Sequence, residues 1–281
     1  GMIIPLSTGL IVEYFTGDRR VRQLGVSSAV NNLTLVVATS VVGYLADVSW
    51  HLAFAVYLLP LITLILLPAI RRTTPEPEPS GGAQNRQSTL NRGIIARLML
   101  FYFVITYLSL IVTYNTSYLV SERGMGDDRS GVIISLFFLA IMAPGFILDR
   151  IVAWLGAWLN FVSLVMMGIG LVIMSLNTVS FAMLCIGALF TGLGYGVMQP
   201  VVYDKAATNA PPRLSTLALS LVMAVNYLAI LVAPFIIDAI GEMFHNHHQS
   251  LPYFVNGVIS IFIAFVALFR LHRSPVLGSD D

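Results

Sequence analysis

Long apolar stretches alternate with short polar segments along the whole chain. A helix needs ~20 residues to cross the ~30 Å hydrocarbon core of a bilayer, and nine stretches reach or approach that length. Lipid cannot satisfy open backbone groups, so each stretch is expected to be helical. The pattern therefore predicts an all-α polytopic membrane protein with about nine transmembrane helices. Their approximate limits are 2–16, 24–46, 51–70, 94–119, 130–148, 156–176, 178–203, 214–240 and 252–270.

Composition supports a surface covered by lipid. Of the 281 residues, 57% are hydrophobic and 10% are charged, and the mean hydropathy is +0.84. A soluble domain carries about 25% charged residues. The net charge of +1 gives no indication of a nucleic-acid partner. The single cysteine, Cys185, excludes a disulfide framework within this chain.

Basic residues predict the orientation. If the C-terminus is cytoplasmic, thirteen of the 15 Lys and Arg residues fall in inner loops, and Arg123 and Arg129 fall in outer loops. The positive-inside rule therefore predicts a cytoplasmic C-terminus. We expect an integral protein of the bacterial inner (cell) membrane. The first apolar stretch is short and has no basic residue before it. We expect it to be a span cut off at its outer end, so that the chain begins within a longer protein.

One apolar segment occurs twice. AVNNLTLVVAT at residues 29–39 and AVNYLAILVAP at residues 224–234 align at a shift of 195, with Asn31 matching Asn226. Residues 71–92 are rich in Pro, Glu, Gly and Ser, a composition typical of a flexible linker. Three apolar stretches precede this segment and six follow it. The spacing predicts two parallel halves of six spans each.

Three sequence motifs resemble those of the major facilitator superfamily. GLIVEYFTGDRRVRQLGV (9–26) resembles its inner loop between spans four and five, and SWHLAF (49–54) its entry to span six. GFILDRIVAW (145–154) resembles the loop after span eight, where the family pattern is Gly-x-x-x-Asp-Arg-x-Gly-Arg-Arg. Here Gly145, Asp149 and Arg150 match that pattern, whereas the residues at 152–154 are Val-Ala-Trp. In span five, ATSVVG (38–43) keeps only Gly43 of the Gly-Pro-x-x-Gly-Gly motif of drug exporters.

The resemblance implies a two-bundle helical fold with an incomplete N-terminal bundle. Residues 1–71 would be the remainder of that bundle (spans 4–6), residues 72–93 a cytoplasmic linker, and residues 94–281 a C-terminal six-helix bundle (spans 7–12). The first three spans would be absent. Spans seven and ten of this family line the central cavity, and spans five and eleven lie along the contact between the bundles.

A polar stripe follows one face of the stretch 94–119. Tyr102, Thr106, Ser109, Thr113 and Thr116 are spaced 4, 3, 4 and 3 residues apart, so they share one face of a helix. Polar residues in membrane segments usually face the bundle interior, which predicts that these residues line the substrate cavity. The alternative is that each hydroxyl bonds its own helix backbone. Tyr114 flanks the stripe and is a further candidate.

Span ten supplies two more cavity candidates, Tyr195 and Gln199, which follow Thr191 at intervals of four residues. A neighbouring face of small residues is typical of close helix packing. This face consists of Ala188, Gly192 and Gly196. Neither Leu98–Ser121 nor Leu155–Tyr203 contains a charged residue, which favours a neutral or amphipathic ligand over an anion.

Two further sites are predicted. Asp149 and Arg150 lie at an inner helix end and are candidates for an inner gate, with a solvated pair as the alternative. The resemblance places Asn31, Asn226 and the adjacent Tyr227 at the contact between the bundles, where an asparagine could bond across it. The alternative is that each asparagine bonds within its own bundle.

These patterns favour a secondary active transporter that works by alternating access. We expect proton-coupled efflux, as in an antiporter, of a small neutral or amphipathic substrate. The alternatives are an uptake carrier for a neutral nutrient such as a sugar and, more remotely, a non-transporting receptor or interaction protein. No HExxH motif or nucleophile elbow occurs, so the chain is not expected to be an enzyme or to hold a cofactor. The histidines within 244–249 could bind a metal, but a solvated loop is expected instead.

Overall fold

Every element in the described part of the chain is a helix. The computed structural model describes residues 3–49, 51, 58, 91–176, 180–211, 214–245 and 248–269. Long runs of apolar residues favour helices in lipid, and Pro200 and Pro234 lie inside two of these helices without ending them. The helices are α1 (Ile3–Tyr14), α2 (Gly17–Val48), α5 (Arg92–Glu122), α6 (Asp127–Met142), η3 (Ala143–Phe146), α7 (Leu148–Leu155), η4 (Gly156–Trp158), α8 (Leu159–Ser175), α9 (Phe181–Thr208), α10 (Ser215–Met243) and α11 (Ser250–Phe269).

Six helices in the described ranges are long and apolar enough to cross a membrane. They cover Arg92–Glu122, Arg129–Phe146, Leu148–Ser175, Phe181–Thr208, Ser215–Met243 and Ser250–Leu268. The predicted count of about nine is therefore not supported. With 12 residues, α1 is only about 18 Å long. Several charged side chains occupy the first turns of α2, which is not among the six. The predicted span 51–70 lies outside the described residues except for His51 and Leu58.

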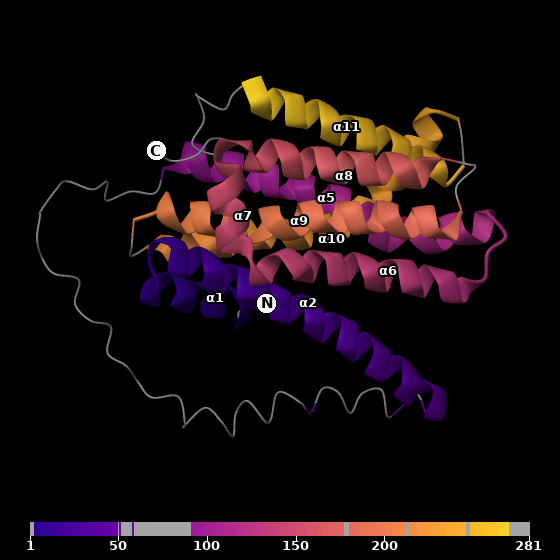
Figure 1. The fold of residues 1–281 in the computed structure, drawn as a ribbon, viewed down its shortest axis with the longest axis horizontal. Coiled ribbons are helices and arrows are strands. Elements are labelled where there is room, and N and C mark those ends of the chain that lie inside the picture. The colour runs from indigo at the N-terminus through magenta and orange to yellow at the C-terminus, as the bar shows by residue number, and fades with distance from the viewer. Residues whose placement is uncertain are drawn as a thin grey trace, which may run out of the picture.

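The six spanning helices lie alongside one another in one bundle, with α1 and α2 on one side of it (Figure 1). Within this bundle α9 packs against α6 and α8, α8 packs against α11, and α5 packs against α10. We name the two ends of the bundle by residues that lie there. The Arg20 end holds the turn between α1 and α2, and the Arg123 end holds the turn between α5 and α6 (Figure 1).

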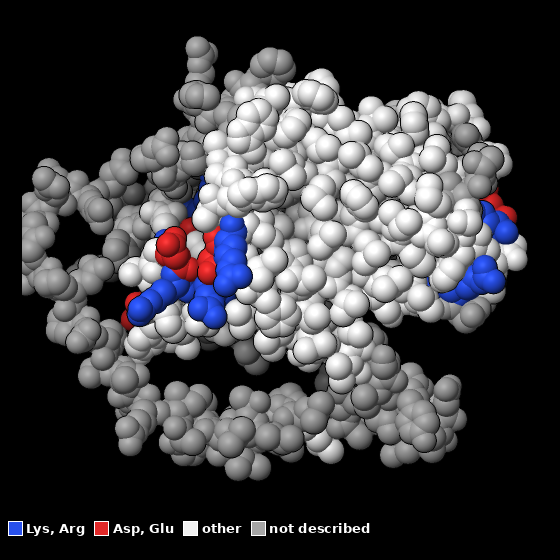
Figure 2. Space-filling view, in the orientation of Figure 1, with Lys and Arg blue, Asp and Glu red and all other residues white. Residues whose placement is uncertain are grey.

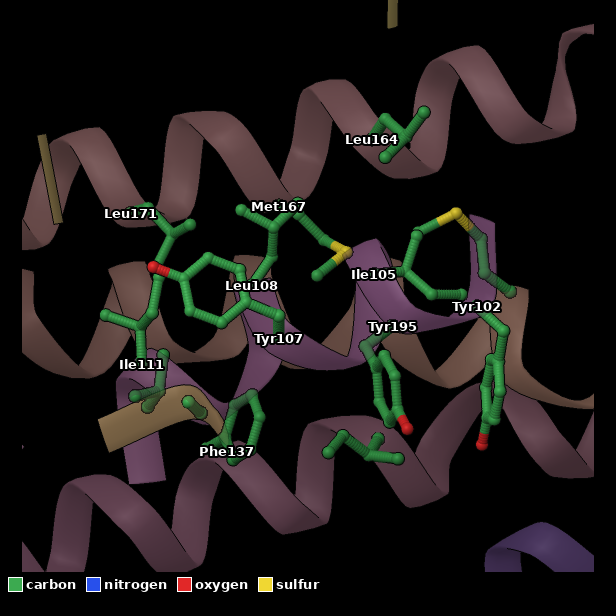
Figure 3. Close-up of a cluster of buried hydrophobic side chains, with 14 of the residues drawn as sticks. Tyr102, Ile105, Tyr107, Leu108, Ile111, Phe137, Leu164, Met167, Leu171 and Tyr195 are labelled. Atoms are coloured by element: carbon green, nitrogen blue, oxygen red, sulfur yellow. The ribbon is translucent and has the colours of Figure 1, made fainter. Parts of the chain in front are cut away.

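Glycines allow α9 to approach its neighbours closely. A Cβ atom added at Gly192 would lie 2.5 Å from the carbonyl oxygen of Phe137 in α6. One added at Gly170 of α8 would lie 2.5 Å from the carbonyl oxygen of Gly187 in α9. Small residues at such contacts let helix backbones pack closely, which is how helices associate in lipid. Buried side chains of the bundle, including Leu164, fill the remaining space (Figure 3).

The N-terminal helices contact this bundle through small residues as well. A Cβ atom added at Gly25 of α2 would lie 2.6 Å from the carbonyl oxygen of Gly145 in η3. On α1, a Cβ atom added at Gly9 would lie 3.0 Å from Oγ1 of Thr216 in α10. These contacts bring α2 against α9, which positions the polar groups described next. Most of the predicted linker 72–93 lies outside the described residues.

Candidate functional site

Two tyrosine hydroxyls meet where α5 packs against α9. The hydroxyl oxygens of Tyr102 and Tyr203 are 2.6 Å apart, and their rings contact edge to face with centroids separated by 5.5 Å. Tyr102 is fully buried. Burial of a hydroxyl is tolerated only when it has a hydrogen-bond partner, and each tyrosine here supplies the other with one.

Gln199 connects this tyrosine pair to α2. Its Nε2 lies 3.4 Å from the hydroxyl of Tyr102 and 3.4 Å from that of Tyr203, and it donates to both. Its Oε1 accepts a hydrogen bond of 3.0 Å from Oγ of Ser28 in α2. We call these four residues, Ser28, Tyr102, Gln199 and Tyr203, the Gln199 network. The network joins three helices, and one of them belongs to the N-terminal part of the chain.

A second pair of hydroxyls lies further along α5 and α9. Oγ1 of Thr106 is 3.5 Å from the hydroxyl of Tyr195, and both residues are buried. The rings of Tyr195 and Tyr102 direct their hydroxyls toward the same side of the bundle (Figure 3). Buried Ser109 donates a 2.7 Å hydrogen bond to the carbonyl oxygen of Thr106. The facing surfaces of α5 and α9 therefore carry hydroxyl and amide groups and no charge.

An ion pair joins α2 to α9 at the Arg20 end. Nε of Arg20 in α2 is 2.6 Å from Oδ1 of Asp204 in α9, and the two side chains are only 15% and 18% exposed. Charged side chains gather at the two ends of the bundle, and the surface between them is uncharged (Figure 2). A charge-assisted hydrogen bond is stronger than a neutral one, so this pair strengthens the contact between α2 and α9.

The structure brings together five of the predicted cavity residues and separates the others. Tyr102, Thr106, Ser109, Tyr195 and Gln199 lie between α5 and α9. The hydroxyl of Thr116 bonds instead to the carbonyl oxygen of Val112 in its own helix and lies 3.0 Å from that of Tyr253 in α11. The hydroxyl of Tyr114 donates to the carbonyl oxygen of Ile230 in α10, at 3.3 Å. Thr113 is half-buried on α5.

The residues predicted at the contact between bundles have different environments. Asn31 and Tyr227 are exposed, and Asn226 is half-buried. On α2 the buried asparagine is Asn32, which donates a 2.8 Å hydrogen bond to the carbonyl oxygen of Ser28. Adjacent residues of a helix point about 100° apart, and here Asn32 faces the bundle whereas Asn31 does not.

The candidate gate residues Asp149 and Arg150 lie in the first turn of α7, where Asp149 is half-buried and Arg150 is exposed. The ion pair between α2 and α9 at this end is formed by Arg20 and Asp204.

Sequence reasoning missed four residues of the site. Tyr203 continues the four-residue spacing of Tyr195 and Gln199 and could have been found by that signal. Nothing in the sequence pairs Ser28 with Gln199, or Arg20 with Asp204, because these contacts depend on how α2 packs against α9.

Other polar contacts hold the Arg123 end together. Arg123 donates from Nη2 to the carbonyl oxygen of Met174 at 2.9 Å, and its partial burial lowers the pKa of its guanidinium. Glu122 accepts hydrogen bonds of 2.7 Å from the backbone N–H of Gln249 and lies 2.7 Å from Nδ1 of His248. Among the described residues, no group of three or more His, Cys, Asp or Glu side chains could hold a metal ion.

Comparison with known proteins identifies the family to which this chain belongs. A comparison with curated proteins gave no match. The family model of the Major Facilitator Superfamily matches residues 1–164 and residues 157–280. The two matched ranges together cover almost the entire chain. The protein therefore belongs to the Major Facilitator Superfamily, whose members are secondary transporters that sit in a lipid bilayer and bind small-molecule substrates.

Proposed function

We propose that this transporter carries a small neutral or amphipathic solute along the facing surfaces of α5 and α9, with Tyr102, Tyr195, Gln199 and Tyr203 as substrate contacts. The observation that carries the proposal is a buried, uncharged cluster of phenol, amide and hydroxyl groups shared by two facing helices. Aromatic rings offer apolar surface and their hydroxyls offer hydrogen bonds, a combination that suits an amphipathic ligand. An anion would require a fixed positive charge at the site.

The contact between α2 and α9 supports alternating access. The N-terminal part of the chain, residues 1–71, would move against the C-terminal bundle, residues 94–281, with residues 72–93 as the connecting linker. In this structure, the ion pair between Arg20 and Asp204 and the hydrogen bond between Ser28 and Gln199 join α2 to α9 at the Arg20 end, and we interpret them as the contacts of its closed state. Opening this end would break both contacts, and closing it would restore them. We place the Arg20 end and the C-terminus in the cytoplasm, because the basic residues gather there.

Asp204 supplies a means of coupling transport to protons. A proton on its carboxylate would remove the negative charge that holds Arg20, and would therefore weaken closure of the Arg20 end. Asp204 directly follows Tyr203, a member of the Gln199 network. A movement of α9 caused by protonation of Asp204 would therefore also displace Tyr203. Proton-coupled efflux is thus the favoured activity. The same phenol and amide groups also suit the hydroxyls of a sugar, which keeps uptake of a neutral nutrient as the second candidate.

Transport by the purified full-length protein in sealed vesicles tests the proposal. We expect an imposed pH gradient to drive a neutral or amphipathic dye against its concentration gradient, and a protonophore to abolish this movement. Tyr102→Phe and Gln199→Leu should both reduce the rate. The matched control is Ser220→Ala, because among the described residues Ser220 donates to the carbonyl oxygen of Thr216 in its own helix, α10. Dye transport that is unchanged in both site variants would refute the assigned site. Proton-dependent accumulation of a sugar, without dye movement, would favour uptake.

A further inference from the structure

The short helix α7 has one apolar face that packs against the bundle. Leu148 is completely buried, and Ile151, Val152 and Leu155 are partly buried against the same cluster. The spacing of these four residues, i, i+3, i+4 and i+7, is that of one helix face. Their partners include Val197 and Val201 of α9. The inner face of α7 therefore fixes the helix on the bundle and determines which side chains point outward.

The opposite face of α7 presents Arg150 and Trp154, which lie one helical turn apart. Trp154 is 85% exposed, and Arg150 is exposed as well. Trp158 in η4 is 53% exposed and continues this surface. Its ring contacts Phe161 at a centroid distance of 5.9 Å, and Phe161 contacts Phe265 of α11 at 5.8 Å. Exposed aromatic groups thus continue from α7 to the outer surface of the spanning helices.

The direction of α7 indicates what this face contacts. Although α7 opens the apolar range Leu148–Ser175, the chain turns at Gly156, so α7 crosses the other helices at the Arg20 end while α8 runs alongside them (Figure 1). Because the spanning helices run through the bilayer, a helix that crosses them near one end lies along the membrane surface. Charged side chains are visible at that end (Figure 2). With the spanning helices in a bilayer, this direction would put the outer face of α7 where the hydrocarbon core gives way to the lipid headgroups.

We propose that Arg150, Trp154 and Trp158 form a lipid-binding face that anchors α7 in the headgroup layer of the membrane. Indole rings concentrate at this depth because they offer an apolar body and one N–H donor. A guanidinium one turn away can donate two parallel hydrogen bonds to a lipid phosphate. The inference does not depend on the substrate or on the direction of transport. It also gives a role to Trp154, which occupies a position where the family pattern has arginine.

Fluorescence quenching by brominated lipids tests this placement. The chain contains three tryptophans, so the full-length variant Trp50→Phe/Trp158→Phe leaves Trp154 as the only tryptophan within residues 1–281. In vesicles we expect stronger quenching of Trp154 by bromine near the headgroup end of the acyl chain than by bromine near its methyl end. Emission should be blue-shifted relative to tryptophan in water. Absence of quenching would mean that water or a protein partner covers the face, and stronger quenching by deep bromine would mean burial in the core. Either outcome would overturn the proposal.

The role of Arg150 needs a separate measurement. In the same Trp50→Phe/Trp158→Phe variant, brominated lipid is supplied either as an anionic or as a zwitterionic species. We expect anionic lipid to quench Trp154 more strongly, and Arg150→Gln to reduce this preference about two- to fivefold. Arg150→Lys should retain most of it, because the charge remains. Arg97→Gln, an exposed arginine in α5, is the matched control and should leave the preference intact. An unchanged preference in Arg150→Gln would remove Arg150 from the lipid-binding face.

Discussion

Ser28 and Gln199 lie 171 positions apart in the sequence, yet Oγ of Ser28 donates a 3.0 Å hydrogen bond to Oε1 of Gln199. The same amide group donates from Nε2 to Tyr102 and Tyr203. One side chain of α9 thus contacts both the N-terminal part of the chain and the proposed substrate site. A movement of α2 away from α9 would leave the Gln199 carbonyl oxygen without its partner from α2 while the tyrosine contacts persist.

Replacing Ser28 by alanine is expected to favour the state that is open at the Arg20 end. An interhelical hydrogen bond in a membrane protein contributes ~0.6 kcal/mol, which corresponds to about a threefold shift of a two-state equilibrium. Opening is measured by the rate at which a water-soluble thiol reagent labels a cysteine that replaces Leu24. Leu24 is 2% exposed and lies between Arg20 and Ser28 on one face of α2. In a Cys185→Ala background, Ser28→Ala should increase labelling of this cysteine about threefold.

Two comparisons make the Ser28 experiment specific. Ser28→Thr keeps the hydroxyl and should label close to the parent rate. Ser220→Ala removes a hydroxyl that donates to the carbonyl oxygen of Thr216 within α10, and it should also leave labelling unchanged. Equal labelling of Ser28→Ala and the parent would show that this hydrogen bond does not influence closure.

Phenylalanine at either position of the tyrosine pair is expected to weaken substrate binding. Tyr102→Phe and Tyr203→Phe each remove a hydroxyl from the Gln199 network but keep the ring, so packing changes little. Loss of one hydrogen bond should raise the dissociation constant about three- to tenfold. Direct ligand binding in detergent measures this change, and melting of the purified protein checks that the fold is intact. Tyr118→Phe is the matched control, because Tyr118 is exposed on the outer surface of α5. A similar loss of affinity in the control would point to a general effect on the helix.

The sequence predicted those features that depend on a single helix. The stretches around α5, α6 and α8–α11 are apolar over nearly the length of a bilayer crossing, and they form helices within a few residues of the expected limits. The spacing placed Tyr102, Thr106 and Ser109 on one face of α5, and all three are buried in the structure. That expectation required only the period of a helix. That they line a substrate cavity stays a prediction.

Features that depend on two helices could not be predicted in the same way. Thr116 shares the stripe of Tyr102, but it faces Tyr253 because α11 covers this part of α5. Arg20 meets Asp204 across 184 positions, and no sequence spacing fixes such a pair. The repeated asparagine motif likewise could not indicate whether Asn31 or Asn32 faces the bundle.

Gly192→Ala is expected to destabilise the C-terminal bundle. The added Cβ would lie 2.5 Å from the carbonyl oxygen of Phe137 and 2.8 Å from Cβ of Ala140, so α6 and α9 would have to separate. Overpacking of this kind costs about 1–3 kcal/mol. A lower melting temperature of the purified protein would show the effect. Gly131→Ala in α6 is the control, because nothing lies within 4 Å of its added Cβ, and stability there should stay the same or rise. Equal melting of the two variants would contradict the close packing of α6 on α9.

The ion pair between Arg20 and Asp204 should control closure more strongly than the Ser28 hydrogen bond does. Hydrogen bonds to charged groups contribute about 1.5–3 kcal/mol, and this pair is largely shielded from water. Asp204→Asn should therefore increase labelling of the cysteine at position 24 by about tenfold or more. If a proton on Asp204 drives opening, the asparagine variant imitates the protonated carboxylate. Because the thiolate is the reactive form of a cysteine and becomes scarcer as the pH falls, the labelling rates of the parent and of Asp204→Asn are compared at each pH. The ratio of the parent rate to the variant rate should rise toward one as the pH falls.

The charge-reversed double variant Arg20→Asp/Asp204→Arg separates the contact from the individual residues. It restores an ion pair between α2 and α9 with exchanged partners, so labelling of the cysteine at position 24 should return toward the parent level, while Arg20→Asp alone should label rapidly. Proton-driven transport would still differ from the parent, because the carboxylate has moved from α9, beside Tyr203, to α2. If the double variant labels as fast as either single variant, the attraction between these two residues does not hold the Arg20 end closed. If the double variant labels as slowly as the parent and still couples transport to protons normally, the coupling carboxylate lies elsewhere in the protein.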